Sequence, residues 1–147
     1  MTSPVHRDAA QALDEHLEHI GHDMQRWIEL FADDAVVEFP YAPPGLPGRF
    51  EGKEAIDHYF RATPEKFLGL SFRDVRRYPT TDPDVALAEA HGSATIASTG
   101  KRYEQDYVMV LRTRHGRIVL YREYWNIAAV LEAFGGTEAL GRAVNAS

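Results

Sequence analysis

The chain has 147 residues, which fits a single domain on a scale of about 100–200 residues per domain. Its 16 Lys and Arg residues and 22 Asp and Glu residues give a formal net charge of −6, and hydrophobic residues make up 44%. The sequence contains no cysteine, which excludes a disulfide scaffold, a thiol nucleophile and any zinc or iron–sulfur site built on cysteine.

The charge pattern and the apolar runs limit the partners and the compartment. The basic residues are not clustered as binding to nucleic acid or to an anionic membrane requires. No apolar run approaches the roughly 18 residues that cross a bilayer, and the segment MTSPVHRDAA lacks the basic patch and apolar stretch of a signal peptide. We therefore expect a cytoplasmic protein without nucleic-acid or membrane partners. Its single domain spans 1–147, with a core at about 8–135 and a tail at 136–147.

The first third of the chain is predicted to be mainly helical. A helix starts at Ser3-Pro4 and ends near Gly21, and its apolar stripe consists of Ala9, Leu13, Leu17 and Ile20. Asp23 is the expected cap of a second helix, and a short strand follows at 35–39. Residues 40–52 contain four prolines and three glycines and are predicted to be a loop, which a helix at 53–61 follows.

From residue 70 onward the hydrophobic period changes to two, which is typical of strands. Four strands are predicted, at 70–78, 85–97, 103–113 and 117–126. Their short connections favour an antiparallel meander. A helix at 127–134 ends at Gly135-Gly136, and Thr137 either caps one more short helix or opens a frayed tail. The predicted fold class is α+β, a cone-shaped curved antiparallel sheet wrapped around N-terminal helices.

Alternation divides each strand into two faces. In 85–97 the even positions from Ala86 to Ile96 are apolar and small, so a ligand or bulky neighbours must fill the space beside them. In 117–126, Glu123 shares a face with Tyr121 and Trp125, and this face is either a buried surface or a solvated or dimer-forming one. In 103–113 the pattern does not decide which face is inside.

The segments LFADDAVVEFPYAPPGLPGRFEGKEAIDHYFR and GRIVLYREYWN resemble the nuclear transport factor two-like superfamily. This superfamily includes ketosteroid isomerases, SnoaL-type polyketide cyclases, limonene-epoxide hydrolases and the PhzA/PhzB proteins. The resemblance covers about 8–135, and the layout of the meander is most similar to the SnoaL-like and PhzA/PhzB-like branch. It implies a cone with a deep apolar pocket, in a homodimer formed through the sheet.

The departures from these relatives indicate which chemistry is retained. The general-base aspartate of ketosteroid isomerases matches Phe39, and the acid of their oxyanion hole matches Val108. The arginine and one aspartate of limonene-epoxide hydrolases match Ala90 and Gly92. Their remaining aspartate, like a glutamate of the PhzA/PhzB proteins, matches Glu123. Glu123 is therefore the catalytic position that this chain keeps, and the Ala86–Ile96 face is the inner one.

Three residues are candidates for catalysis. Glu123 is the first, as a general acid and base whose pKa burial would raise, against a structural role as an ion-pair partner at a dimer surface. Asp106, interpreted as inward-facing with Val108, would share the pocket, or it would only lie at the rim of the barrel. His16 on the first helix is either a pocket group or a solvated histidine. Should the faces be reversed, His91 and Glu89 replace Glu123.

Aromatic side chains are the expected pocket walls, although aromatic residues at such spacings also form ordinary cores. The predicted ligand-binding residues are Trp27, Phe39, Tyr41, Tyr59, Phe60, Tyr121 and Trp125. The histidines of the first helix do not match a metal-binding spacing, so we expect no metal site and no cofactor.

The sequence therefore predicts a cofactor-independent small-molecule enzyme. Carboxylate acid–base catalysis in an apolar pocket would drive cyclisation, isomerisation, dehydration or condensation of a small hydrophobic or polycyclic ligand. The alternative is a non-catalytic ligand-binding or dimerisation module of the same fold. That alternative predicts a cone filled by protein side chains, with Glu123 in the dimer interface.

Overall fold

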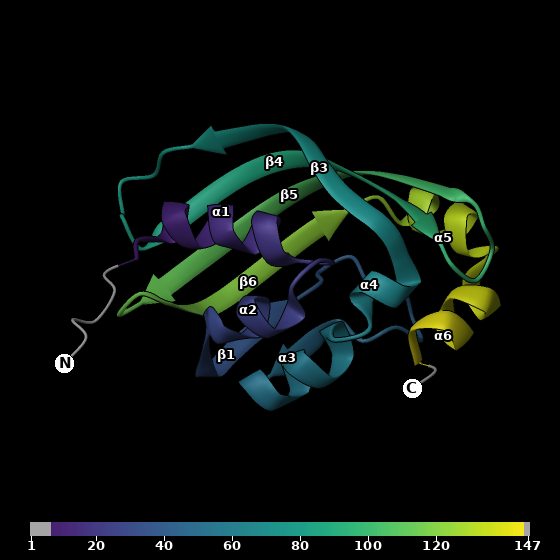
Figure 1. Ribbon diagram of the computed structural model, residues 1–147, viewed down its shortest axis with the longest axis horizontal. Helices are drawn as coiled ribbons and strands as arrows, with labels where there is room; N and C mark the ends of the chain where they lie inside the picture. The colour runs from purple at the N-terminus through teal and green to yellow at the C-terminus, as the bar shows by residue number, and fades with distance from the viewer. Residues whose placement is uncertain (1–6, 146–147) are drawn as a thin grey trace.

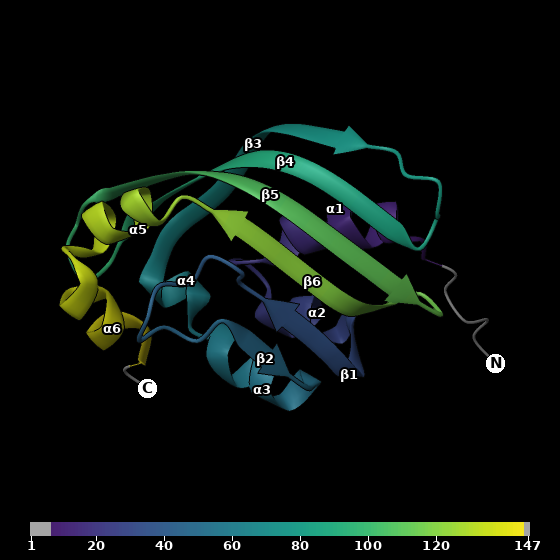
Figure 2. The ribbon, with the colours of Figure 1, turned by 180° about the vertical axis from the view of Figure 1, so that it is seen from behind.

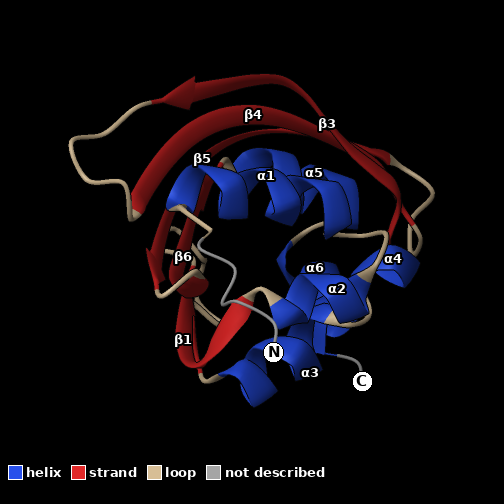
Figure 3. Ribbon diagram, turned by 60° about the vertical axis from the view of Figure 1, so that its left-hand side comes forward, coloured by secondary structure: helices blue, strands red, loops and turns tan. Residues whose placement is uncertain are grey.

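The computed structural model describes residues 7–145 and has an α+β fold, as predicted (Figure 1). The helices are α1 (Ala9–His19), α2 (Met24–Glu29), α3 (Lys53–Phe60), α4 (Thr63–Lys66), α5 (Ile127–Phe134) and α6 (Thr137–Asn145). The strands are β1 (Phe31–Glu38), β2 (Arg49–Glu51), β3 (Phe67–Tyr78), β4 (Val85–Ile96), β5 (Arg102–Arg114) and β6 (Arg117–Trp125). They form one curved sheet that arches over α1 and α5 (Figure 3).

The strand order is β2-β1-β6-β5-β4-β3, and the antiparallel meander from β3 to β6 confirms the prediction. The first strand departs from the antiparallel arrangement of the predicted sheet, because β1 pairs with β6 in parallel, for example Val37 with Tyr121. The predicted loop at 40–52 also contains the short strand β2, which pairs with β1. Helix α4 was not predicted either. Together these pairings bring the first third of the chain beside its last strand.

Local sequence accounts for most of the helix ends. Asp8 caps α1 in a capping box with Gln11, so the helix begins at Ala9 and not at Ser3-Pro4, which lie outside the described residues. Asp23 caps α2 as predicted, and its carboxylate accepts a hydrogen bond of 3.0 Å from the Arg26 amide. Gly135, at φ 90°, ends α5 in the left-handed conformation that glycine adopts without strain.

The tail forms the helix α6 and is not frayed within the described range. Thr137 is the first residue of this helix, and Leu140 is 2% exposed. Helices α5 and α6 contact each other, and they lie together at one end of the sheet (Figures 1 and 2). The segment that the sequence left open is therefore part of the packed domain. No helix between residues 7 and 145 has both the length and the hydropathy that crossing a membrane requires.

The inner face of β4 agrees with the predicted alternation. All even positions from Ala86 to Ile96 are buried, whereas the odd positions from Val85 to Thr95 are partly exposed. Helix α1 packs against β4 and β5, and the rings of Tyr107 and Phe72 cover Gly92. Bulky neighbours therefore fill the space beside these small residues, which was one of the two alternatives. Figure 2 shows the opposite face of β4 to β6, with α1 behind the sheet.

Candidate active site

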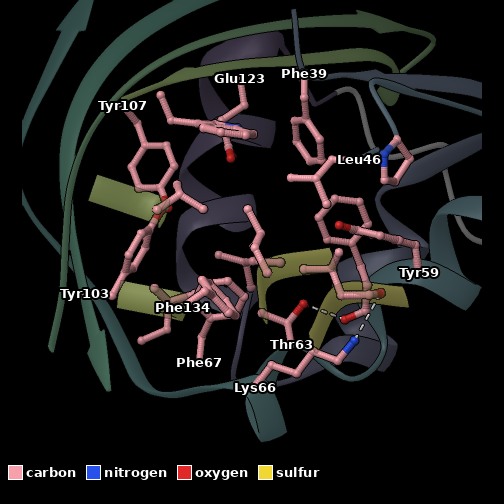
Figure 4. A pocket seen from close by; sticks show the side chains of 18 of the residues that line it. Phe39, Leu46, Tyr59, Thr63, Lys66, Phe67, Tyr103, Tyr107, Glu123 and Phe134 are labelled. Atoms are coloured by element: carbon pink, nitrogen blue, oxygen red, sulfur yellow. Dashed lines mark hydrogen bonds between the residues drawn. The ribbon is translucent and has the colours of Figure 1, made fainter. Parts of the chain in front are cut away.

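A cavity of about 130 Å³ lies between the inner face of the sheet and the helices α1 and α3 to α6. Figure 4 shows Glu123 at one end of it, and Thr63 and Lys66 at the other. Tyr103 and Tyr107 lie along one side, with Phe39, Leu46 and Tyr59 along the other. The wall is predominantly apolar and aromatic with a few polar groups, which is the usual composition of a site for a small organic molecule.

Glu123 reaches the cavity because it follows the alternation of β6, between Tyr121 and Trp125 on the inner face. The Tyr121 hydroxyl donates a hydrogen bond of 2.5 Å to Oε2 of Glu123, and it is the single hydrogen-bond partner that residues 7–145 supply to this carboxyl. Burial raises the pKa of Glu123 to about 7, and the hydrogen bond from Tyr121 lowers it by a smaller amount. Both protonation states are therefore populated near neutral pH.

His16 lies on the buried face of α1, is 2% exposed and lines the same cavity. Its Nδ1 accepts a hydrogen bond of 2.8 Å from Nε1–H of Trp27, while Nε2 has no partner among residues 7–145. Burial lowers the pKa of His16 to about 3, so the imidazole is uncharged at neutral pH. Its ring centroid is 4.4 Å from that of Tyr121, so His16 and Glu123 both adjoin this tyrosine.

Tyrosine hydroxyls supply most of the remaining polar groups of the wall. The hydroxyls of Tyr103 and Tyr107 are 2.7 Å apart and share a hydrogen bond. Burial raises the pKa of both phenols, and it raises the pKa of Tyr59 to about 12 together with the negative charge of Glu123. These hydroxyls are therefore neutral near pH 7.

Comparison with known proteins identifies the family. Residues 10–121 match the model of the SnoaL-like domain. The chain belongs to the SnoaL-like family. It is 48% identical to an uncharacterized PhzA/B-like protein of Pseudomonas aeruginosa, over 83% of this chain and 86% of that protein. The predicted membership of the nuclear transport factor two-like superfamily is thus confirmed.

Two solved structures of the same fold are similar along most of the chain. One is a candidate isomerase from Bacillus subtilis, with a TM-score of 0.81 and 42% identity, covering 88% of this chain and 94% of that one. The other is a phenazine biosynthesis-related protein from Pseudomonas aeruginosa, with a TM-score of 0.77 and 22% identity, covering 86% and 80%. At 22% identity, the similarity to the phenazine biosynthesis-related protein shows a shared fold and nothing further.

Most of the predicted catalytic and ligand-binding residues line the cavity. They are His16, Phe39, Tyr59, Phe60, Tyr121, Glu123 and Trp125. Trp27 does not, because it is 1% exposed in the core, where its indole packs on Phe31 and Phe60. Tyr41 is 58% exposed, with its ring beside that of Tyr124, and it is also absent from the cavity wall.

The placement of Asp106 in the pocket was wrong. Its side chain is 91% exposed on the outer face of β5, where it pairs with Nδ1 of His91 at 2.8 Å. The inward set of β5 contains Tyr103, Gln105 and Tyr107 instead. Val108, which was matched to the pocket acid of ketosteroid isomerases, is likewise on the outer face. The match of β5 to the family therefore assigned its outward-facing residues to the pocket.

His91 lies on the outer face as predicted, so the reversed assignment of the sheet faces is excluded. It is held between Asp106 and Glu104, and these two carboxylates raise its pKa. Glu89, on the same face, accepts a hydrogen bond from the Tyr78 hydroxyl. Among residues 7–145, no group of three His, Asp or Glu side chains is placed to hold a metal ion.

The sequence analysis did not predict the end of the cavity opposite Glu123, which Thr63 and Lys66 line. Thr63 donates a hydrogen bond of 2.6 Å to the carbonyl of Phe60, and Nζ of Lys66 lies 3.4 Å from the carbonyl of Val144. Both residues belong to α4, whose start is marked by Pro64 in its first turn. That proline was the available signal for this helix.

Proposed function

We propose that this chain is a small-molecule isomerase or cyclase that works without a cofactor, and that Glu123 moves a proton to or from a hydrophobic ligand in the cavity. The observation that carries the proposal is a partly buried carboxyl at the wall of an apolar cavity, with a pKa of about 7. A general acid or base works best when its pKa is close to the working pH, because both forms are then available.

The surroundings of Glu123 suit it to removing a proton from carbon. The ionised carboxylate takes a proton from a C–H group next to a carbonyl, and the electron pair of that bond passes into the enolate. The protonated carboxyl then returns the proton to a different atom, which gives isomerisation, or the enolate attacks within the ligand, which gives cyclisation. Because Tyr121 contacts Oε2, Oε1 is the oxygen left to face the ligand.

The alternative, a binding or dimerisation module, makes different predictions for the same residues. It requires a cone filled by side chains and Glu123 on the dimer-forming face. The cavity of about 130 Å³ and the position of Glu123 in its wall support the enzyme instead. The isomerase name of the Bacillus subtilis structure, at 42% identity, also favours this choice.

The experiment starts with a screen for ligands that raise the melting temperature, because a ligand of the native state stabilises it. The panel consists of polycyclic, aromatic and terpenoid ketones and acids. Each ketone that binds is then incubated in D₂O, and proton NMR follows the exchange of its hydrogens next to the carbonyl. We expect the wild type to accelerate this exchange.

Two matched variants assign the exchange to the cavity. Glu123→Gln keeps the shape of the side chain and should slow the exchange by about 10²–10⁴-fold, the usual contribution of one acid–base group. Asp106→Asn removes a carboxylate from the outer face of the sheet and should leave the exchange unchanged. Equal rates for the wild type and Glu123→Gln, or no exchange with any bound ketone, would contradict the proposal.

A further inference from the structure

His16, a residue of the cavity wall, carries a fully buried ring nitrogen without a hydrogen-bond partner among residues 7–145. Three polar residues are buried in the described range: His16, Gln105 and Thr113. Gln105 exchanges two hydrogen bonds of 2.9 Å with the backbone of Asn126, and the Thr113 hydroxyl donates to Asp84. Only Nε2 of His16 has no partner among residues 7–145. Buried polar groups are nearly always paired, so this exception requires an explanation.

Trp27 determines which nitrogen of His16 carries the proton. An indole N–H can only donate, so Nδ1 of His16 must present its lone pair to Nε1–H of Trp27, at 2.8 Å. A neutral imidazole has one N–H, which is therefore on Nε2. Burial keeps the ring neutral by lowering its pKa to about 3. The unpartnered atom is thus a hydrogen-bond donor, and its partner must be an acceptor.

Trp27 is itself held in place by aromatic packing. Its ring centroid lies 4.6 Å from that of Phe31 and 5.0 Å from that of Phe60, and its side chain is fully buried. The indole therefore cannot turn away from His16 without disturbing the core. His16 lines the cavity, and Nε2 is the ring nitrogen that Trp27 leaves free. The protein thus keeps a neutral, fixed N–H on a residue of the cavity wall.

We propose that Nε2–H of His16 donates a hydrogen bond to a carbonyl oxygen of the ligand, and that Trp27 is the positioning residue that fixes the donor. The oxygen would lie close to Glu123, because the His16 ring adjoins Tyr121 and the Tyr121 hydroxyl contacts Glu123. The ligand class that fits is a hydrophobic ketone with a hydrogen on the carbon next to its carbonyl. The catalytic part of this inference rests on the proposed function, whereas the binding part does not.

The uncharged state of His16 matters for the chemistry at Glu123. A positive charge on an imidazolium in the wall of the same cavity would favour the ionised carboxylate and lower its pKa, which would weaken it as a base. A neutral donor avoids this and still stabilises the negative charge that gathers on the oxygen when Glu123 removes the adjacent proton. His16 keeps its own proton throughout, and the proton held by Glu123 returns to the product, so the step consumes no co-reactant.

The first test reads the state of His16 directly. Nitrogen-15 NMR of histidine-labelled protein, with His16 assigned from the spectrum of His16→Phe, distinguishes the two neutral tautomers and the charged form. We expect the neutral Nε2–H form from pH 5 to pH 8 in the wild type and a mixture of tautomers in Trp27→Phe. A charged ring at pH 6, or a proton on Nδ1, would overturn the proposal without any ligand being added.

The second test compares two probes that differ in one atom position. Acetophenone carries a carbonyl where α-methylstyrene carries a methylene group of similar shape. Calorimetry should show that the ratio of the acetophenone affinity to the α-methylstyrene affinity is about tenfold higher in the wild type than in His16→Phe, which corresponds to about 1.4 kcal/mol. Without the donor, the ketone oxygen loses its bond to water and gains no partner, so His16→Phe should favour α-methylstyrene more than the wild type does. His16→Gln, which places an amide N–H near the position of Nε2, should restore part of the wild-type ratio.

The outcomes separate this inference from the proposed function. No binding of acetophenone, or the same affinity ratio in the wild type and His16→Phe, would each contradict the role of His16. Glu123→Gln should slow hydrogen exchange yet keep the affinity ratio of the wild type. Failure of the exchange alone therefore counts against Glu123, and failure of the affinity ratio alone counts against His16.

Discussion

Tyr121 and Glu123 lie two residues apart on the same face of β6, and the tyrosine hydroxyl donates to the carboxyl at 2.5 Å. Successive inward positions of a strand are neighbours, so this pair follows directly from the period of two in the sequence. Burial raises the pKa of Glu123 and the hydrogen bond lowers it. The pair therefore determines the pH at which the Glu123 carboxyl ionises.

The pH profile of catalysis should report this balance. For a step in which the ionised carboxylate removes a proton, kcat/KM should rise with pH and level off above an inflection near pH 7. Tyr121→Phe removes a hydrogen bond that favours the ionised form, so the inflection should move to higher pH. Tyr103→Phe, whose hydroxyl pairs with Tyr107, is the control. An inflection that stays in place in Tyr121→Phe would refute this account.

The stability of the fold should also depend on Glu123. Its pKa is about 7 in the folded chain against a model value of 4.5, so between these pH values the folded state binds more protons than the unfolded state. The free energy of unfolding should therefore fall as the pH rises from 4.5 to 7. Urea titrations should show similar stability of the wild type and Glu123→Gln at pH 4, and a more stable Glu123→Gln at pH 8. A variant that is less stable at pH 8 would be evidence against a buried charge.

Gly92 is required by the two rings that pack on it. A Cβ at this position would lie 2.7 Å from Cε2 of Tyr107 and 3.2 Å from Cε1 of Phe72. The Tyr107 ring is tied to Tyr103 through its hydroxyl, so it has little freedom to yield. Gly92→Ala should cost about 1–3 kcal/mol in the free energy of unfolding and change the shape of the cavity.

Gly141 is the matched control for this substitution. It lies in α6, and a Cβ there would meet no atom within 4 Å. Gly141→Ala should be neutral or stabilise the fold by up to about 1 kcal/mol, because alanine is the better helix former. Equal effects of the two substitutions in urea unfolding would show that the contact with Tyr107 is unimportant.

We propose that the outer face of the sheet forms a homodimer, as the family resemblance implies. Val108 is 37% exposed in the middle of this face, opposite Glu89 on β4 and Tyr124 on β6. Val108→Asp adds a carboxylate beside Glu89 and should convert a dimer into a monomer, as sedimentation velocity would measure. Val108→Thr should remain dimeric. A monomeric wild type would disprove the proposal.

Alternation divided β4 and β6 correctly into two faces each. It left open whether the face of Glu123 is buried, and the family resemblance decided that this face is the inner one. In β5 both faces carry apolar residues, so Asp106 was assigned to the wrong side and Tyr103 and Tyr107 were missed. Trp27 was identified as important but as a wall residue, because burial and a hydrogen bond to His16 are not visible in a spacing.

The parallel pairing of β1 with β6 could not be predicted from local sequence patterns. Strand pairing across many residues leaves no periodic signal, and the proline-rich composition of 40–52 concealed β2. Similarly, α4 has only four residues, too few for a helical period. The sequence predicted elements from short-range spacing, whereas the far wall of the cavity depends on which distant elements meet.

The pairing of β1 with β6 also determines how much of the chain must be synthesised before the cavity can form. Glu38 and Arg122 are 84 positions apart, and they are register partners joined by a hydrogen bond of 3.0 Å. Closing so long a loop has an entropic cost that must be met before the pairing stabilises the chain. On the ribosome, β1 must therefore wait with an unpaired edge until β6 has been made. The cavity therefore requires β6, and a chain halted before residue 117 lacks both Glu123 and the strand that positions it.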